Sequence, residues 1–347
     1  MQKIAGSLQR AGFEAVLVGS SNRQSPPLVK QPFQQHRLPV RFKKGPLFYL
    51  EFNVKLAFWL LTQRRISAIC AIDLDTIIPV WLACKFKKTL PVYDAHELFI
   101  EMKEVVTRPR VHAFWRWVEK TFVPAFTYGY TVNLFLQQYF KKTYGVQYGI
   151  VENRPVFAEY PQKNTAKSPF LLYQGAVNHG RSFETLVPAM QHISVPLVVC
   201  GDGNFMPQLK ELINKHELNS KIELRGMVLP AQLKAITPNA TIGLTLFENL
   251  GLNQIHSLAN RFFDYIMCGV PQICVAYPEY EAINKQHQVA LLIPDTQPET
   301  IAHAVNKLLN DSVLYTTLQN NCLQAAKQLS WQYEEEKLIT MYTNWLA

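Results

Sequence analysis

Residues 257–279 read SLANRFFDYIMCGVPQICVAYPE, and this stretch decides the fold. Its apolar residues recur at helical spacing and predict a core-facing side: Phe262, Phe263, Ile266 and Met267. We expect Ser257 to cap the helix, and Gly269 to end it in the left-handed conformation. The short apolar run 273–276 then predicts a buried strand. A helix followed closely by such a strand is typical of an α/β sheet protein.

Three polar residues remain on this helix: Asn260, Arg261 and Asp264. Asn260 and Asp264 are four positions apart and share one face. A carboxylate in that position can accept two hydrogen bonds from a vicinal diol such as a ribose. The alternative is an amphipathic helix with no ligand.

The stretch resembles the donor-sugar-nucleotide segment of GT-B glycosyltransferases, especially bacterial members of glycosyltransferase family 4. That family often shows S-x-P-N-K-x-F-E-Y-M-A-x-G-x-P-V at this point. Here Ala259 stands in place of the Pro, Arg261 in place of the Lys and Asp264 in place of the Glu. The resemblance covers nearly the whole chain and is most specific over residues 169–281.

A composition of 48% apolar and 18% charged side chains favours a folded protein. A chain of 347 residues is longer than one ordinary domain, so we expect two. The six cysteines form no C-x-x-C pair and indicate reduced thiols, which favours a cytoplasmic location. The N-terminus MQKIAGSLQR predicts an amphipathic helix and not a signal peptide. The longest uncharged run, residues 121–140, contains Pro, Gly, Asn and Gln, so we expect no transmembrane span.

Charge is uneven along the chain. Residues 1–165 hold 23 Lys and Arg against 11 Asp and Glu, whereas residues 166–347 hold 12 against 15. A basic half predicts contact with an anionic surface, and both phospholipid and nucleic acid qualify by charge. No nucleic-acid motif is present, so no nucleic-acid partner is expected.

One segment of the basic half bears on that contact. Residues 107–126 mix Phe and Trp with Arg and Lys, a composition that fits either a membrane interface or aromatics packed inward under solvated charges. Residues 47–63 predict a strongly apolar helix, with Glu51 and Lys55 paired on its exposed side.

Polar residues follow a predicted strand at residues 90–93 in the first half. Asp94, His96 and Glu97 would lie at its carboxyl end, where α/β sheets bind ligands. The family resemblance implies that His96 lines the cleft near the transferred sugar, with Asp94 and Glu97 on the acceptor side. The Asp73-Leu74-Asp75 triplet matches a metal motif of another glycosyltransferase fold, but a helix cap from Asp75 or Thr76 is favoured.

Glycine-rich loops follow two strands in the second half. Gly175 and Gly180 lie in GAVNHGRSFE after a strand at 169–174, and Gly201 and Gly203 follow a strand at 196–200. A helix beginning near residue 182 would offer free N–H groups, and Arg181 could clamp phosphate oxygens. The resemblance assigns this loop and its basic residue to the nucleotide diphosphate.

Glu248 and the residues after it resemble the first half of the family's E-x7-E element, whose first Glu approaches the donor sugar. The spacing differs, because Glu248 precedes Asp264 by sixteen positions and His256 stands eight before it. Backbone amides around Gly251 and Leu252 would then replace that Glu in binding sugar or phosphate.

Together these features predict two Rossmann-like doubly wound domains facing across a cleft, the GT-B fold. We expect an N-terminal acceptor-side domain (1–160), a C-terminal donor-binding domain (168–328) and a last helix (330–347) that crosses back to the first domain. In the family a first strand and glycine loop precede the residues at 3–19. We therefore expect either a start codon further upstream or a protein that lacks this strand.

The resemblance implies a retaining glycosyltransferase of the hexosyltransferase type, acting in surface polysaccharide or glycolipid synthesis. It would move a sugar from a nucleotide-diphosphate sugar to a glycan or lipid-linked acceptor, with no cofactor and no metal. Catalytic roles fall to His96, Glu248 and Asp264, and donor binding to the loop residues above with Asn260 and Arg261. We expect a cytoplasmic protein with peripheral contact at the inner face of the plasma membrane. Two alternatives remain open: a non-catalytic sugar-nucleotide-binding protein and a hydrolysing sugar-nucleotide epimerase.

Overall fold

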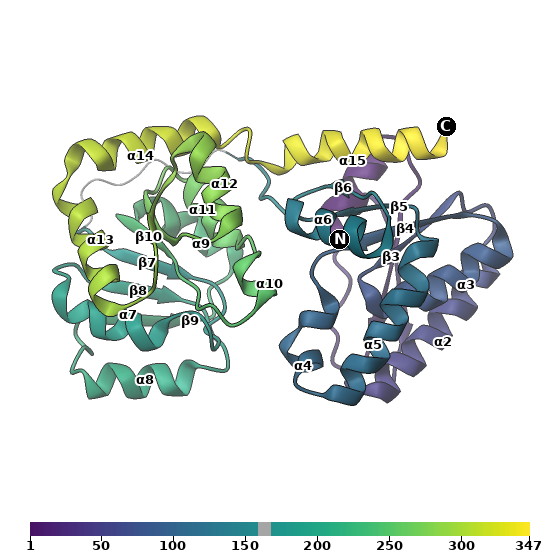
Figure 1. Ribbon diagram of the computed structural model, residues 1–347, viewed down its shortest axis with the longest axis horizontal. Helices are drawn as coiled ribbons and strands as arrows, with labels where there is room; N and C mark the ends of the chain where they lie inside the picture. Colours follow the sequence, from purple (N-terminus) through teal and green to yellow (C-terminus); the bar gives the residue numbers. More distant parts are fainter. Residues whose placement is uncertain (159–167) are drawn as a thin grey trace. The chain divides into compact units, whose positions relative to one another are not determined.

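Parallel strands joined by helices build both halves of the chain (Figure 1). The computed structural model describes residues 1–158 and 168–347. The chain divides into two units, of which the first comprises Met1–Glu152 and Glu334–Ala347 and the second Asn153–Tyr333. Every strand pair within the described residues is parallel, which confirms the predicted α/β fold with parallel sheets.

The first unit contains two parallel sheets that share one hydrophobic core. The smaller sheet pairs β1 (Val16–Ser21) with β2 (Gln34–Pro39), and the larger has the order β3-β4-β5-β6. The larger sheet consists of β3 (Ala68–Ile72), β4 (Leu90–Ala95), β5 (Tyr128–Thr131) and β6 (Gly149–Ile150). Leu38 and Val40 at the end of the small sheet and Ile69 and Ala71 of β3 belong to one buried cluster.

Helices of the first unit cover these sheets. Their bounds are α1 (Gln2–Arg10), α2 (Pro46–Thr62), α3 (Ile77–Lys87), α4 (Lys103–Val106), α5 (Pro109–Phe122) and α6 (Leu134–Tyr144). The C-terminal helix α15 (Trp331–Leu346) packs on the same sheet, because Tyr342 contacts Tyr130 and Met341 covers Gly149. Trp115 and Phe122 of α5 are buried, whereas Phe114 and Trp117 are about half exposed.

The second unit is built on one six-stranded sheet with the order β12-β11-β10-β7-β8-β9. Its strands are β7 (Leu171–Gln174), β8 (Leu197–Cys200), β9 (Ile222–Gly226), β10 (Ile242–Thr245), β11 (Gln272–Val275) and β12 (Ala290–Ile293). Because successive side chains of a strand point to opposite faces, Leu171 and Tyr173 join one core and Leu172 another. Both faces are therefore buried, as a doubly wound sheet requires.

The helices of the second unit lie on both faces of this sheet (Figure 1). They are α7 (Phe183–Ala189), α8 (Met206–Lys215), α9 (Pro230–Ile236), α10 (Leu252–Ile255), α11 (Asn260–Met267), α12 (Pro278–His287), α13 (Pro298–Asn310) and α14 (Ser312–Ala325). The apolar side of α11 is buried as predicted, and Gly269 ends this segment with φ +61°.

The predicted cap of α11 is wrong. The helix begins at Asn260 with Ala259 as its N-cap, and the Ser257 hydroxyl donates to the Gln254 carbonyl instead. His256 ends α10 in a turn and the N-cap residue Ala259 has extended angles, so Ser257 lies two positions before the N-cap of α11.

No helix in the described part of the chain is both long and apolar enough to cross a membrane.

Candidate active site

The loops that follow β7 and β8, at the carboxyl edge of the six-stranded sheet, pack directly on each other. The amide of Gly175 donates to Cys200 O at 2.9 Å, and the amide of Phe205 donates to Val177 O at 2.9 Å. A Cβ on Gly201 would lie 1.8 Å from Gly175 O, and one on Gly203 would lie 2.3 Å from Val177 O. Gly201 and Gly203 are therefore required by loop packing, before any ligand is considered.

Gly175 and Gly180 have a different reason to be glycine. Their φ angles are +123° and +79°, which L side chains rarely adopt. A Cβ on Gly180 would also come within 2.6 Å of Gln254 Nε2, and one on Gly175 within 3.2 Å of Arg261 Nη1. These two glycines bring the β7–α7 loop close to Arg261 and to the segment before α11.

Arg181 and Arg261 lie against the same aromatic ring. The Cζ atom of Arg181 is 4.4 Å from the centre of the Phe247 ring, and that of Arg261 is 4.6 Å from it. Arg261 is 7% exposed and also stacks on Tyr173 at 4.5 Å. The two guanidinium groups thus come together from the β7–α7 loop and from the first turn of α11, eighty positions apart in the sequence.

These two arginines have no acidic partner among the residues that the structure describes. Arg261 is held by neutral acceptors: Tyr173 Oη at 3.2 Å, Gln174 O at 3.4 Å and Leu246 O at 3.4 Å. The Nε atoms of both arginines are buried without a hydrogen-bond partner. Burial, and then the charge of Arg261, lowers the pKa of Arg181. Buried positive charge without a counter-ion favours an anionic ligand.

The aromatic residues of this site were missed in the sequence analysis. Phe247 lies two positions after β10 and Tyr173 lies inside β7, and both have the sequence context of ordinary core residues. The one sequence signal for this site was the position of Phe247 just beyond the carboxyl end of a strand.

Asp264 faces the end of β7. Its Oδ2 accepts a hydrogen bond from Gln174 Nε2 at 2.8 Å, and Gln174 Oε1 accepts one from the Thr237 hydroxyl at 2.7 Å. Asn260, one turn earlier on α11, is exposed, and its Oδ1 lies 3.5 Å from Asn153 Nδ2. The structure therefore places Asp264 next to the Arg261 site, because Gln174 contacts both residues.

Glu248 lies beside the β7–α7 loop. Its amide donates to Gly180 O at 3.1 Å. Its carboxyl lies near the Ser182 amide and the Glu184 carboxyl, and both affect its pKa. Burial, followed by the charge of Glu184, raises the pKa of Glu248. An acidic side chain of the protein therefore lies near the start of α7, where the phosphate contact is predicted.

Gly251 and Leu252 begin the short helix α10. Gly251 has φ +139°, and Leu252 is 43% exposed. His256 lies after this helix, and its Nδ1 is 3.3 Å from Glu279 Oε1. None of the described hydrogen bonds tests whether the amides of Gly251 and Leu252 bind sugar or phosphate, so that role stays a prediction.

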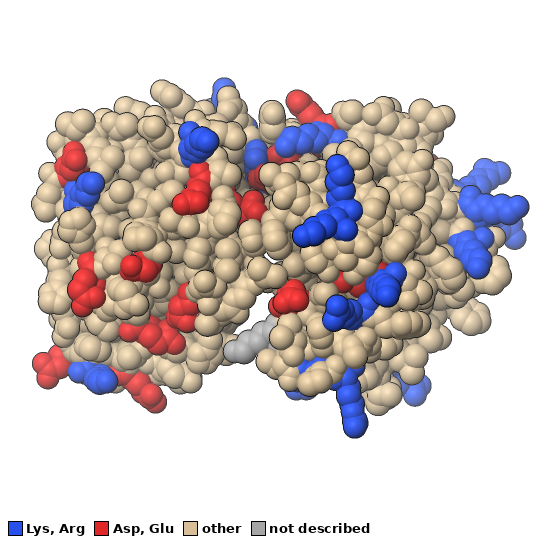
Figure 2. Space-filling view, in the orientation of Figure 1, with Lys and Arg blue, Asp and Glu red and all other residues tan. Residues whose placement is uncertain are grey.

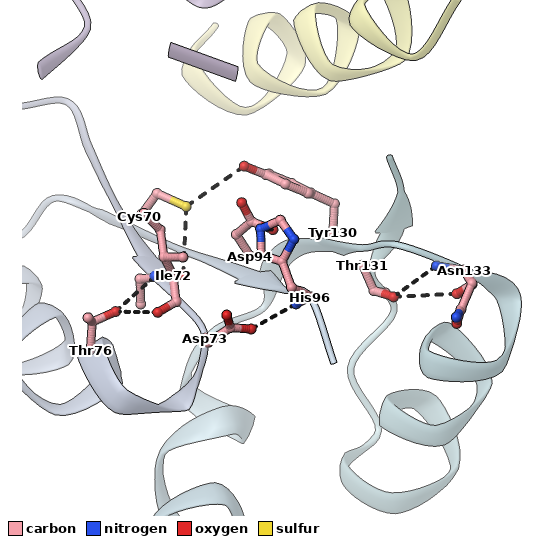
Figure 3. Close-up of polar contacts among 10 residues, drawn as sticks. Cys70, Ile72, Asp73, Thr76, Asp94, His96, Tyr130, Thr131 and Asn133 are labelled. Atoms are coloured by element: carbon pink, nitrogen blue, oxygen red, sulfur yellow. Dashed lines mark hydrogen bonds and ion pairs between the residues drawn. The ribbon is translucent and has the colours of Figure 1, made fainter. Parts of the chain in front are cut away.

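A second set of predicted residues lies in the first unit, at the carboxyl ends of β3 and β4 (Figure 3). Asp94 is 1% exposed, and its Oδ1 lies 3.1 Å from His96 Nε2. The His96 amide donates to Asp73 Oδ1 at 2.8 Å. The strand end thus brings one imidazole and two carboxyl groups together.

The charges of this cluster are shifted by burial and by one another. Burial lowers the pKa of His96, but the hydrogen bond and charge of Asp94 and the charge of Asp73 outweigh it, so the pKa is raised. Burial raises the pKa of Asp73 to about 7, although His96 opposes the shift. Burial also raises the pKa of Glu97, which follows His96 in the chain. A group that changes protonation near neutral pH suits proton transfer or sugar binding.

Asp73 and Asp75 form no metal-binding set. Among the described residues, no three His, Cys, Asp or Glu side chains gather as metal ligands would. The Thr76 hydroxyl bonds both the amide and the carbonyl of Ile72, at 2.9 and 2.8 Å. Thr76 is the N-cap residue of α3, but its side chain bonds the end of β3 and not the helix.

Comparison with known proteins places the chain in a family. Residues 156–329 match the family model described as glycosyl transferases group 1. A search of curated proteins finds no significant match.

Solved structures with the same fold span the whole chain. Sucrose-phosphate synthase from Thermosynechococcus elongatus has a TM-score of 0.76 at 14% identity, with 99% of this chain and 91% of that chain covered. Anabaena HepE in complex with UDP has a TM-score of 0.73 at 12% identity, covering 99% and 96%. WaaG, a glycosyltransferase involved in lipopolysaccharide biosynthesis, has a TM-score of 0.71 at 14% identity, covering 98% and 94%. These similarities establish the GT-B fold, and the family match establishes that the chain is a glycosyltransferase belonging to the glycosyl transferases group 1.

Proposed function

We propose that this enzyme binds the diphosphate of a nucleotide-sugar donor at Arg181 and Arg261 and transfers the sugar to a glycan or lipid-linked acceptor. The observation that carries the proposal is the pair of guanidinium groups on Phe247 without an acidic partner. A diphosphate provides the missing negative charge and accepts several charge-assisted hydrogen bonds. Planar guanidinium groups match phosphate oxygens in bidentate fashion.

The same pair would promote the reaction. Negative charge builds on the diphosphate as the bond to the sugar breaks, and preorganised donors stabilise it most in the transition state. The loss of one such donor typically costs about 3 kcal/mol in the barrier. Because the arginines provide this charge, the proposal needs no cofactor and no metal.

The remaining site residues take roles in the proposal that follow the family resemblance. Asp264 and Asn260 would hold the ribose, with Glu248 near the donor sugar. His96, supported by Asp94, would contact the sugar that is transferred, with retention of its configuration. Glu97 and Asp94 would lie on the acceptor side.

Two observations guide the choice of donor and acceptor. HepE, which shares the fold, was solved with UDP and with UDP-glucose, so uridine nucleotides are the first donors to test. The first unit holds 22 Lys and Arg against 13 Asp and Glu, a net charge of +9. That charge supports an acceptor in surface polysaccharide or glycolipid synthesis, held at the inner face of the plasma membrane. A nucleic acid would satisfy the charge equally, but the sequence contains no nucleic-acid-binding motif.

The proposal is tested by donor turnover. Wild-type enzyme is incubated with UDP-, GDP- and ADP-sugars and a membrane lipid extract, and the released nucleotide and the labelled lipid are both measured. We expect one donor to give label in lipid, and Arg261→Ala to lower kcat/KM by about 100-fold. Arg225→Ala is the matched control, because Arg225 lies exposed in the same unit, paired with Glu223.

Two results would overturn the proposal. Release of nucleotide with no sugar in any acceptor, and an epimerised free sugar as product, would identify a hydrolysing epimerase. Binding of a nucleotide sugar with no turnover, from folded wild-type protein, would identify a non-catalytic binding protein.

A further inference from the structure

Helix α2 is apolar on two opposite sides. Phe52, Leu56 and Leu60 point into the core of the first unit. On the other side five large apolar residues repeat every three or four positions: Leu47, Leu50, Val54, Phe58 and Leu61. This spacing places them in one line along the helix, which we call the α2 stripe.

The α2 stripe is open to solvent. Phe58 is 73% exposed and Leu50 is 63% exposed. At 1.5 Å per residue the stripe extends about 21 Å along the helix. Phe86 of α3, which packs beside α2, is also exposed. An apolar surface of this length marks an interaction site, because single exposed apolar residues are common but a continuous row is not.

Basic side chains frame the α2 stripe at both ends. Lys43 and Lys44 precede α2, and Arg64 and Arg65 follow it, all exposed. Lys87 of α3 donates to Gln63 O, which ties the end of α3 to the end of α2. The exposed residues Lys85 and Lys88 therefore join the basic group at that end.

Negative charge is sparse around the stripe. The single acidic residue of α2 is Glu51, whose Oε1 lies 2.7 Å from Lys55 Nζ on the same helix. Over the first unit, Figure 2 shows mainly blue Lys and Arg side chains, with few red ones. The surroundings of the stripe are therefore cationic.

We propose that the α2 stripe docks on an anionic lipid bilayer, with α2 lying in the plane of the interface. Leu and Phe would enter the boundary between headgroups and acyl chains, and the flanking Lys and Arg would contact anionic headgroups. A second copy of the chain is the weaker occupant, because it would bring two cationic frames together. The inference deepens the proposed function, since a docked enzyme reaches a lipid-linked acceptor.

The α2 stripe also revises where the membrane contact was expected. The sequence left residues 107–126 open between a membrane interface and aromatics packed inward, and Trp115 and Phe122 of that segment are buried in the core. Phe114 and Trp117 of α5 remain about half exposed.

The test is co-sedimentation with vesicles of phosphatidylcholine alone or mixed with phosphatidylglycerol. Wild type should bind the mixed vesicles and not the neutral ones, and added salt should weaken binding. Leu50→Glu/Phe58→Glu should reduce binding about tenfold or more, because two charges then enter the interface. Both side chains are exposed, so we expect Tm to stay unchanged. Val313→Glu is the matched control, an equally exposed apolar residue (76%) in the second unit.

A second pair of variants tests the basic frame. Arg64→Glu/Lys88→Glu should weaken binding to the anionic vesicles while the α2 stripe stays intact. Stripe variants that bind vesicles as wild type does would overturn the proposal. So would a wild-type dimer in analytical ultracentrifugation that becomes monomeric in Leu50→Glu/Phe58→Glu. Nucleotide binding is measured in parallel, so failure of membrane docking and failure of the donor site are distinguished.

Discussion

Glu119 shows at the residue scale how burial alone sets a pH dependence. This α5 carboxyl is 1% exposed, and it accepts hydrogen bonds from the Tyr144 and Tyr139 hydroxyls at 2.8 and 3.3 Å. Burial raises its pKa from 4.5 to about 7, and the two hydrogen bonds reduce the shift. The folded protein therefore binds an extra proton between these pH values, and the stability due to Glu119 is lost as pH rises through about 7.

Glu119→Gln should remove this pH dependence. The amide oxygen of Gln can still accept both hydroxyls and carries no charge to bury. We expect the free energy of unfolding at pH 8 to rise by about 1–3 kcal/mol, with little change at pH 4. Urea unfolding across this pH range measures it, with Glu211→Gln on the exposed side of α8 as control. A variant less stable than wild type at pH 8 would contradict the account.

His96 gives a second prediction at the same scale. Its pKa is raised in spite of burial, chiefly because of Asp94. The stability from this pair is thus present at low pH and lost as pH rises above the folded pKa of His96. Asp94→Asn should lower that pKa, since an amide offers no charge to the imidazolium. NMR titration of protein with isotope-labelled histidine measures the change in the His96 pKa. The His96 resonance is assigned by its absence in the His96→Gln variant. An unchanged His96 pKa would show that Asp94 does not govern it.

At the scale of elements, the position of α11 depends on a glycine in the neighbouring strand. A Cβ on Gly243 of β10 would lie 2.4 Å from the Tyr265 ring of α11. Tyr265 is fully buried, and its hydroxyl donates to Leu172 O at 2.8 Å. The close approach of α11 to β10 thus keeps Arg261 and Asp264 at the sheet edge.

Gly243→Ala should move α11 and weaken the donor site. Overpacking of this kind typically costs about 1–3 kcal/mol of stability. Gly19→Ala is the matched control, because a Cβ there meets nothing within 4 Å. Differential scanning fluorimetry should show a lower Tm for Gly243→Ala alone. Equal Tm values for the two variants would contradict this prediction, because they would show that α11 can move away from β10 without loss of stability.

The sequence predicted elements better than it predicted their ends and contacts. The helical period of Phe262, Phe263 and Ile266 established α11, because the repeat belongs to the helix itself. The cap at Ser257 failed, since the path of residues 256–259 depends on contacts outside the segment. Glu51 and Lys55 indicated the exposed side of α2, but the exposed apolar row on it could not be recognised, because apolar residues occupy both sides of the helix.

The site shows the same limit. Arg181 and Arg261 were each predicted from a local motif, but their meeting on Phe247 depends on tertiary structure. Gly201 and Gly203 were assigned to ligand approach, whereas the structure shows that packing of two loops already requires them. The spacing of residues in the sequence does not predict that the two arginines share one ring or that the two glycine-containing loops pack together.

At the scale of the whole molecule, the chain combines the proposed donor site in one unit with a basic surface that bears the α2 stripe on the other. The donor site carries unpaired positive charge at two arginines. The first unit carries the net positive charge of the chain, because the second has 13 Lys and Arg against 13 Asp and Glu. Substitutions at the two arginines should therefore abolish donor binding without affecting membrane binding, and substitutions in the α2 stripe should do the reverse.

The central claim is that Arg181 and Arg261 bind a diphosphate, and calorimetric titration tests it most directly. Uridine, UMP and UDP are titrated into wild type and into Arg181→Ala/Arg261→Ala, with Arg225→Ala as control. We predict that UDP binds wild type at least 100-fold more tightly than uridine, and that the double variant loses most of this difference while Arg225→Ala keeps it. Equal affinity of wild type for uridine and UDP, or an undiminished preference for UDP in the double variant, would contradict the account.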